Sequence, residues 1–293
     1  MIEAYFIHLL ILIGIYAILA ISLNLAMGYT GLINLGHVAF YAIGAYTSAL
    51  LTLNLGLPFW FGLILGGIMA AIFSLLLAIP TLRLRGDYLA IATLGFAIVT
   101  ESILRNWTSL TRGPLGLPGI PKPELFGFHF NNLAYLILVI VFVILTYLII
   151  NHLVKSPFGR VLRAIREDQL AAASLGKNVM KYKTQALAIS AFFAGIAGSL
   201  YAHYINFIDP STFTVLESIL IISMIIIGGL ASVRGAVIGA FILVLLPEPL
   251  RFLPIPSFAI GALRQIIYAV LLVLILIKRP QGITGEFVIK KEG

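Results

Sequence analysis

The segment KSPFGRVLRAIREDQLAAASLGKNVMKYK (residues 155–183) is a short polar stretch between two long apolar runs. Seven of its 29 residues are Lys or Arg, whereas only 10% of the whole chain is charged. Pro157 and Gly159 are typical of the start of such a segment, and Gly176 is typical of a helix end. At 100° per residue an apolar stripe lies beside a positively charged stripe. The charged stripe consists of Arg160, Arg163 and Arg166. We therefore expect this basic segment to be a short helical region between two membrane spans. It is too small for an enzyme domain but suited to contact a partner.

The composition of the 293-residue chain indicates an integral membrane protein. It is 61% hydrophobic, whereas soluble domains are about 45–50% apolar and about 25% charged. The net charge of +8 is explained by an excess of cytoplasmic Lys and Arg without any nucleic-acid partner. There are no cysteines, which excludes disulfides and Cys-ligated metals. The first apolar run lacks the flanks of a signal peptide and is expected to be retained as a span.

The apolar runs predict an all-α protein with about nine transmembrane or half-membrane helices, because a crossing helix needs about 20 apolar residues. Two of the runs are short and interrupted by glycine. The predicted segments are 5–27, 37–53, 59–79, 88–104, 133–153, 184–207, 215–230, 236–246 and 258–277.

The positions of Lys and Arg predict the orientation. With the basic segment in the cytoplasm, 14 of the 19 basic residues lie inside. Nine crossings then place the N-terminus outside and the C-terminus in the cytoplasm. Residues 105–132, rich in Pro and Gly, become an irregular external loop. We expect one transmembrane domain over residues 1–293.

Glycines mark two further features. Small residues four apart indicate close helix packing. They are Gly62/Gly66, Ala191/Gly195, Ala194/Gly198 and Gly235/Gly239. The stretches 28–36 and 228–235 interrupt the apolar pattern in opposite halves of the chain. Irregular backbone at membrane depth survives only where protein or a water-filled cavity satisfies it, so paired breaks indicate a permeation route.

Motifs of catalysis are missing. The sequence around Gly176 and Lys177 is not a phosphate-binding loop, because Ala171 and Asn178 replace the required Gly and Ser/Thr. The five histidines lack metal-ligand spacing, and no nucleophile–base pair is recognisable. We expect neither an enzyme nor a chain with its own cofactor or metal. Among ionisable residues in spans, Glu101 and Glu217 are least easily explained by a position near a helix end.

Four stretches resemble the permeases of branched-chain amino acid ABC importers, specifically the LivM-like subunit. They occur in the family's order and span nearly the whole chain. They are LNLAMGYTGLINLGHVAFYAIGAYTSAL (23–50), LRLRGDYLAIATLGF (82–96), SPFGRVLRAIREDQLAAASLG (156–176), and IGGLASVRGAVIGA (227–240) with the end signal RPQG (279–282).

The resemblance implies a type II ABC importer permease with the fold of the vitamin B12 importer, in a bacterial or archaeal inner membrane. It implies a LivH-like second permease and two ATPase subunits, LivG/LivF-like, which use ATP and Mg. An external binding protein would deliver the amino acid. A urea or short-amide importer permease remains an alternative, as does a secondary transporter or channel without an ATPase.

The resemblance also gives the basic segment a role as a cytoplasmic coupling segment that docks in a cleft of the ATPase. Ala171, Ala172 and Gly176 match the family's A-A-x-x-x-G core, while Gln169 stands where a carboxylate is often found. Arginines would pair with acidic groups, and apolar insertion would dominate the contact. The inserted residues would be Leu162, Ile165, Leu170 and Leu175. The alternative is a basic amphipathic helix lying on anionic lipid.

Two sets of site residues follow from the resemblance and, for Glu101 and Glu217, from their place in apolar spans. The coupling residues are Gly159, Arg160, Arg163, Arg166, Glu167, Asp168, Ala171, Ala172 and Gly176. The translocation path would be lined by Asn24, Gly28, Thr30, Asn34, His37, Glu101 and Glu217.

Overall fold

The computed structural model describes residues 2–81, 84, 86–125, 128–248, 257–279 and 281–284. Nearly all of the described chain is helical. The long helices are α1 (Ile2–Asn24), α2 (His37–Leu55), α3 (Phe59–Thr81), α4 (Asp87–Asn106), α6 (Asn132–Lys155), α9 (Val179–Ile205) and α12 (Ser257–Lys278). Shorter helices are α5 (Thr108–Thr111), α7 (Pro157–Glu167), α8 (Gln169–Ser174), α10 (Val215–Gly228) and α11 (Val233–Leu245). Helical turns are η1 (Leu25–Tyr29), η2 (Gly113–Leu115) and η3 (Pro210–Thr212).

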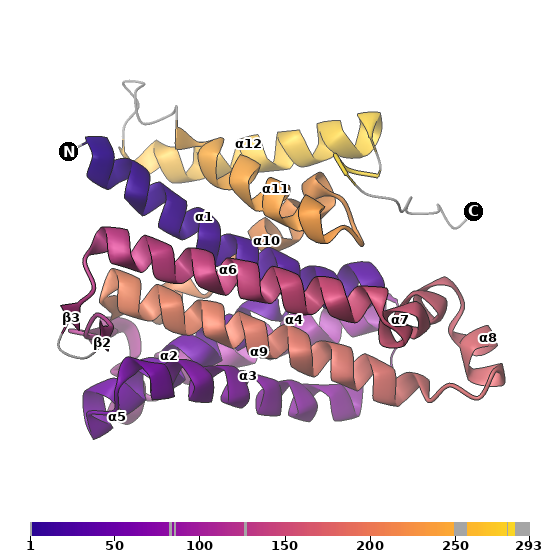
Figure 1. Cartoon of the computed structure of the whole chain (residues 1–293), viewed down its shortest axis with the longest axis horizontal. Helices are drawn as coiled ribbons and strands as arrows, with labels where there is room; N and C mark the ends of the chain where they lie inside the picture. Colours follow the sequence, from indigo (N-terminus) through magenta and orange to yellow (C-terminus); the bar gives the residue numbers. More distant parts are fainter. Residues whose placement is uncertain are drawn as a thin grey trace.

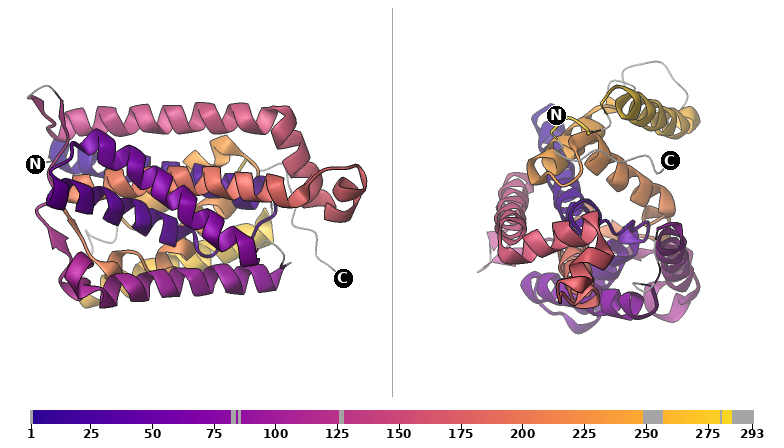
Figure 2. Two further views of the ribbon diagram at one scale, coloured as in Figure 1. Left: turned by 90° about the horizontal axis from the view of Figure 1, so that it is seen from below. Right: turned by 90° about the vertical axis from the view of Figure 1, so that its right-hand side faces the viewer.

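The long helices form a bundle along one axis (Figure 1). The N-terminus and the predicted external loop lie at one end, and α7 and α8 project at the other end, which we call the α7 end. Figure 2 shows the same separation of the two ends in a second view. Four two-residue strands pair antiparallel, β1 (Leu117–Pro118) with β4 (Phe207–Ile208) and β2 (Glu124–Leu125) with β3 (Phe128–His129). The loop over 105–132 thus contains only short elements where it is described.

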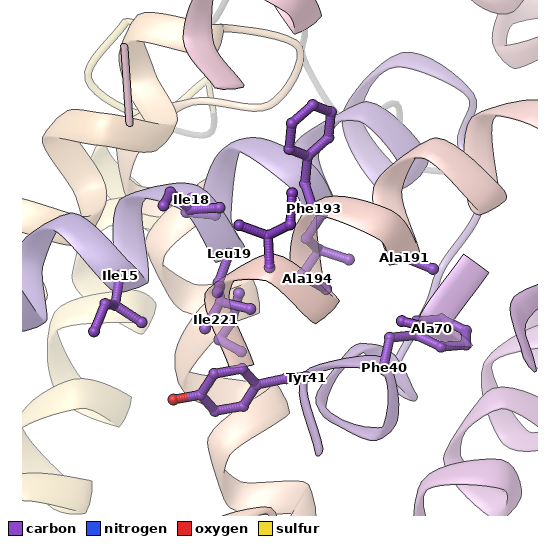
Figure 3. Close-up of a cluster of buried hydrophobic side chains, with 14 of the residues drawn as sticks. Ile15, Ile18, Leu19, Phe40, Tyr41, Ala70, Ala191, Phe193, Ala194 and Ile221 are labelled. Carbon is purple, nitrogen blue, oxygen red and sulfur yellow. The ribbon is translucent and has the colours of Figure 1, made fainter. Parts of the chain in front are cut away.

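The core lies around α9, which packs mainly on α2, α3 and α1. Figure 3 shows side chains of α1, α2, α3, α9 and α10 that converge there, among them Ile18, Tyr41 and Ala194. Ile18 and Ala194 are fully buried, and Tyr41 is 1% exposed. The apolar runs are helical because a membrane interior offers no water to the backbone, and a helix satisfies its backbone polar groups within its own segment.

Seven helices in the described part of the chain are long and apolar enough to cross a membrane. They are Glu3–Tyr29, His37–Leu55, Phe59–Thr81, Asp87–Asn106, Asn132–Lys155, Val179–Ile205 and Pro210–Gly228. Two shorter apolar helices, Val233–Leu245 and Gln265–Ile275, overlap the last two predicted segments. The multi-pass helical architecture is confirmed, while nine crossings remain a prediction. Arg83, Arg85, Arg251, Lys290 and Lys291, which entered the orientation argument, lie outside the described residues.

The predicted close packing at small residues is present at the centre of the bundle. A Cβ added at Gly44 of α2 would collide with the backbone of Gly195 in α9. A Cβ at Gly195 would lie 2.6 Å from the carbonyl oxygen of Gly66 in α3. Three helix backbones therefore approach one another where only glycine fits.

We expect Gly44→Val to destabilise the isolated chain by about 1–3 kcal/mol, the usual cost of overpacking a core. Gly95→Val in α4 is the matched control, because no atom lies within 4 Å of the Cβ position there. The measurement is thermal unfolding of both variants in detergent. Equal midpoints would show that the α2–α9 contact is looser than described.

Candidate functional site

The basic segment folds as two helices rather than one. Asp168 separates α7 from α8 in an extended conformation, with φ −152° and ψ 107°. Its carboxylate accepts hydrogen bonds from the backbone N–H groups of Leu170 (2.8 Å) and Ala171 (3.0 Å), and so caps α8. Gly176, with φ +76°, follows α8 and ends it as its position in the sequence predicts. The break gives the segment a short second helix at the far tip of the molecule (Figure 1).

The apolar face of α7 is buried inside this chain. Leu162 is fully buried and Ile165 is 3% exposed, and Gly159 packs against the backbone of Val154 in α6. The expectation that Leu162 and Ile165 insert into an ATPase was wrong, because their side chains already belong to the protein's own core. Leu170 and Leu175, by contrast, are 63% and 79% exposed.

Polar contacts hold α8 onto the bundle. The ammonium group of Lys183, which is 7% exposed, donates a hydrogen bond of 2.9 Å to Oε1 of Gln169. Ala172 is buried beneath α8, whereas Ala171 faces outward. No pattern in the sequence distinguishes Lys183, which is buried, from the six other basic residues of the segment. Gln169 is therefore hydrogen-bonded to a cation of its own chain, Lys183.

The three arginines of the charged stripe differ in environment. Arg160 is exposed and Arg163 is partly buried. Arg166 turns inward: its Nη1 donates a hydrogen bond of 2.6 Å to the carbonyl oxygen of Gly28. Its Nη2 lies 2.9 Å from the carboxylate of Glu167, and only 11% of its side chain is exposed. Arg166 is thus a contact within this chain, and Arg160, Arg163, Glu167 and Asp168 remain on the outer side.

Gly28 belongs to the first predicted break, where η1 continues α1 as a π-helical turn. Single π-helical turns of this kind are frequent at functional sites. The side chain of Arg166 also covers the next glycine, since a Cβ on Gly31 would lie 3.1 Å from its Cγ. The basic segment therefore rests directly on the first break.

Asn24, the last residue of α1, joins the chain just before the first break to the second break. Its amide nitrogen donates a hydrogen bond of 2.8 Å to the carbonyl oxygen of Ser232, and its Oδ1 accepts one of 3.0 Å from the N–H of Ala231. A Cβ on Gly28 would lie 2.6 Å from the same N–H. Asn24 is 1% exposed, so both hydrogen bonds are made in the interior. An unbroken set of contacts runs from α7 through the first break to the second.

The remaining path candidates of the first break are buried polar residues. His37 is fully buried, with its Nε2 2.9 Å from the Ser22 hydroxyl. Asn34, 1% exposed, accepts a hydrogen bond of 3.0 Å from the N–H of Gly36. The hydroxyl of Thr30 donates to the carbonyl oxygen of Ala26. None of these three side chains lines the cavity of about 650 Å³ that borders Glu217.

The two carboxylates singled out by sequence lie in different settings. Glu101 forms an ion pair of 2.6 Å with Arg105 near the end of α4. Glu217, in the first turn of α10, accepts a hydrogen bond from the hydroxyl of Tyr16 in α1. It also borders a cavity of about 650 Å³ between α1, α10, α11 and α12. The structure does not bring Glu101 and Glu217 into one site.

These features define a class of protein. A bundle of apolar helices, broken at paired glycine-rich turns and tied to a small polar cap at one end, is the architecture of a multi-pass membrane transport protein. The family model of the permease component of branched-chain amino acid transport systems matches residues 5–276. The chain belongs to this family, as its sequence motifs predict, and so to transport components rather than enzymes.

Individual relatives agree with this assignment. The chain is 40% identical over 294 residues to the high-affinity branched-chain amino acid transport system permease protein LivM of Escherichia coli K12, covering 92% of this chain and 67% of that protein. It is 26% identical to the probable LivM permease of Methanocaldococcus jannaschii, covering 95% and 92%. It is 27% identical to the LivH permease of E. coli K12, covering 94% and 93%. No solved structure matches the chain.

Proposed function

We propose that this chain is the LivM-like transmembrane permease subunit of an ATP-driven ABC importer for branched-chain amino acids. It pairs with a LivH-like permease and two LivG/LivF-like ATPase subunits, which hydrolyse ATP with Mg. An external binding protein delivers the substrate. The chain adopts the permease fold of the vitamin B12 importer in the cell inner membrane, with the N-terminus outside and the α7 end in the cytoplasm. The set of contacts from Arg166 through Gly28 and Asn24 to Ala231 carries the proposal, because it joins the basic segment to both breaks.

In this proposal the two helices of the basic segment have separate tasks. The exposed side chains of Leu170 in α8 and of Leu175 just after it enter the ATPase cleft. Arg160 and Arg163 add ion pairs at the rim of the cleft. An exposed ion pair contributes only about 0–1 kcal/mol, whereas a buried leucine side chain contributes about 1.5–3 kcal/mol. The buried face of α7 fixes it to the bundle, so ATPase closure moves α7 and the first break together.

Transport then proceeds by alternating access. ATP binding favours one arrangement of the paired permeases, and hydrolysis favours the other. The ATPase can shift this equilibrium only by the difference between its binding free energies for the two arrangements. The predicted path residues of the first break, including Asn34 and His37, become accessible when the breaks move. Cysteine substitution tests this directly, because the chain has no native cysteine. Labelling of 28–37 that never responds to nucleotide would contradict it.

We expect Leu175→Asp to weaken ATPase binding by about tenfold or more, because a buried leucine is replaced by a charge in an apolar cleft. The matched control is Leu115→Asp. Leu115 is 80% exposed and Leu175 is 79% exposed, but Leu115 lies at the opposite end of the bundle. The measurement is co-purification of the ATPase with the tagged permease. Unchanged co-purification of both variants would favour a basic helix lying on lipid instead.

Two rival functions have different requirements. A secondary transporter or channel needs no ATPase, so leucine uptake by vesicles of this chain alone would support it. A urea or short-amide importer needs the same partners but another substrate. Uptake of labelled leucine and of labelled urea by the complete reconstituted complex, with and without ATP, separates all three. The proposal predicts ATP-dependent uptake of leucine and no uptake of urea.

A further inference from the structure

The end signal RPQG (residues 279–282) directly follows α12. This helix lies at the edge of the bundle and packs mainly on α10 (Figure 1). The N–H group of Gly282 donates a hydrogen bond of 2.9 Å to the carbonyl oxygen of Arg279, which closes a turn just after the helix. Residues 281–284, which we call the C-terminal clasp, then lie against the second break.

The C-terminal clasp supplies hydrogen-bond donors to the end of α10. The last carbonyl groups of a helix have no partner within that helix. The carbonyl oxygen of Ile227 accepts a hydrogen bond of 2.9 Å from the N–H group of Ile283. The carbonyl oxygen of Gly228 accepts one of 3.0 Å from the N–H group of Thr284 and a second, of 2.9 Å, from the hydroxyl of the same residue. These three hydrogen bonds join the clasp to the helix end where the second break begins.

Glycine is required where the clasp comes closest to the second break. Gly282 has a φ of +72°, a conformation that favours glycine. A Cβ at this position would lie 2.6 Å from the carbonyl oxygen of Ile226 and 2.7 Å from the backbone nitrogen of Gly229. The clasp and the break therefore pack backbone against backbone, and any side chain at position 282 would push them apart.

Ser232 of the second break is held from two sides. Its carbonyl oxygen accepts the hydrogen bond from Asn24 at the end of α1. Its hydroxyl lies 3.1 Å from the hydroxyl of Thr284 in the clasp, and it accepts a hydrogen bond from the N–H group of Gly235 that caps α11. The contacts that start at Arg166 thus continue through Ser232 to the clasp and α12.

We propose that the C-terminal clasp positions the second break for transport by tying it to α12. A displacement of the first break reaches Ser232 through Asn24. With the clasp closed, the second break moves together with α10 and α12, so the displacement is passed on to these helices. With the clasp released, the short turn between α10 and α11 shifts alone and absorbs the displacement. Gly282 and Thr284 are positioning residues, and the clasp stays closed in both transport states.

Gly282→Ala releases the clasp, because its Cβ has no room against the second break. The matched control is Gly119→Ala, since Gly119 has a similar φ of +78° but no atom within 4 Å of the Cβ position. Hydrogen exchange of the complete transporter, followed by mass spectrometry, shows whether the contact is lost. We expect the peptide that contains Ile283 and Thr284 to lose protection in Gly282→Ala and to keep it in Gly119→Ala. Equal protection in both variants would overturn the inference.

The functional measurement is leucine imported per ATP hydrolysed in proteoliposomes, for variants that co-purify with the partner subunits in normal amounts. We expect Gly282→Ala to lower this ratio by about tenfold or more, because the hydrogen bonds to the second break are lost. Gly119→Ala should leave it unchanged. A wild-type ratio in Gly282→Ala would mean that the clasp only caps α10, which overturns the inference. The inference rests on the proposed function: a wild-type complex that imports no leucine would overturn that function, while hydrogen exchange still tests the clasp.

Thr284 allows a milder change, because it is exposed. Thr284→Val keeps the size of the side chain and the backbone hydrogen bond but removes the hydroxyl. We expect it to lower the import ratio by about threefold, and Thr284→Ser, which keeps a hydroxyl, to restore the ratio. Equal ratios in the two variants would contradict the role of Thr284 as a positioning residue.

A disulfide between Ser232→Cys and Thr284→Cys tests whether the clasp stays closed. The two hydroxyl oxygens are 3.1 Å apart, and the chain has no native cysteine that could compete for the pair. We expect the oxidised transporter to import at least as much leucine per ATP as the same variant after reduction. Lower import after oxidation would show that the clasp must open in each cycle and would overturn the inference.

Discussion

Replacing Arg166 with alanine is expected to leave ATP hydrolysis in the assembled transporter but to lower leucine import per ATP by about tenfold. Arg166 joins α7 to the first break through its hydrogen bond of 2.6 Å to Gly28. Its alkyl chain covers Gly31 as well. Without it, movement of α7 no longer pulls on the carbonyl oxygen of Gly28. The measurement is the ratio of leucine imported to ATP hydrolysed in proteoliposomes.

Arg160→Ala is the matched control for this variant. Arg160 lies on the same helix, six residues earlier, but is exposed. It is expected to change ATPase affinity slightly and the import ratio little, because exposed ion pairs contribute about 0–1 kcal/mol. An unchanged import ratio in Arg166→Ala would contradict the coupling role of this residue. Loss of ATPase binding in Arg166→Ala, but not in Arg160→Ala, would mean that Arg166 contacts the ATPase itself.

The second large effect is expected for Asn24→Leu. Leucine has a similar size but makes neither of the hydrogen bonds that join the end of α1 to the second break, at 2.8 Å to Ser232 and 3.0 Å from Ala231. Each buried backbone group left unpaired costs about 1–3 kcal/mol. We expect a lower unfolding midpoint and loss of leucine import, measured on the same preparation.

Thr111→Val is the control that distinguishes a loss of stability from a loss of the contact made by Asn24. Thr111 is almost as buried as Asn24, with 2% against 1% of the residue exposed, but its hydroxyl bonds only within seven residues of the chain, to Leu104, Trp107 and Gly113. It should lower the unfolding midpoint while import continues. If Asn24→Leu loses no more import than Thr111→Val at matched stability, the contact between Asn24 and the second break has no part in transport.

The two breaks were predictable from the sequence, but their contact was not. Gly28–Gly36 and Gly228–Gly235 interrupt apolar runs, and irregular backbone was expected there because a membrane helix has no reason to break without a partner. The Asn24–Ala231 hydrogen bond, however, joins residues 207 positions apart. Nothing in the local pattern of a single sequence specifies such a pair. For the same reason the Arg166–Gly28 bond, over 138 positions, was found only in the structure.

The pattern of the basic segment predicts its helix correctly but assigns the wrong partner to the apolar face of that helix. An amphipathic helix between two spans has an apolar face, but hydrophobic periodicity does not say which surface covers that face. Leu162 and Ile165 were predicted to insert into the ATPase, but the bundle itself covers them. Asp168 carried a readable signal for the break, because an aspartate before a run of helix formers is a common N-cap. The inward turn of Arg166 had no such signal, since Arg160 and Arg163 share its stripe.

The most direct test of the central claim places a photo-crosslinking benzoylphenylalanine at position 171 in the complete transporter. Ala171 is exposed on α8, and its replacement leaves the buried face of α7 intact. We predict that irradiation joins this chain to an ATPase subunit and that the adduct changes in yield when ATP is added. Crosslinks to the external binding protein or to lipid, with none to the ATPase, would contradict the account.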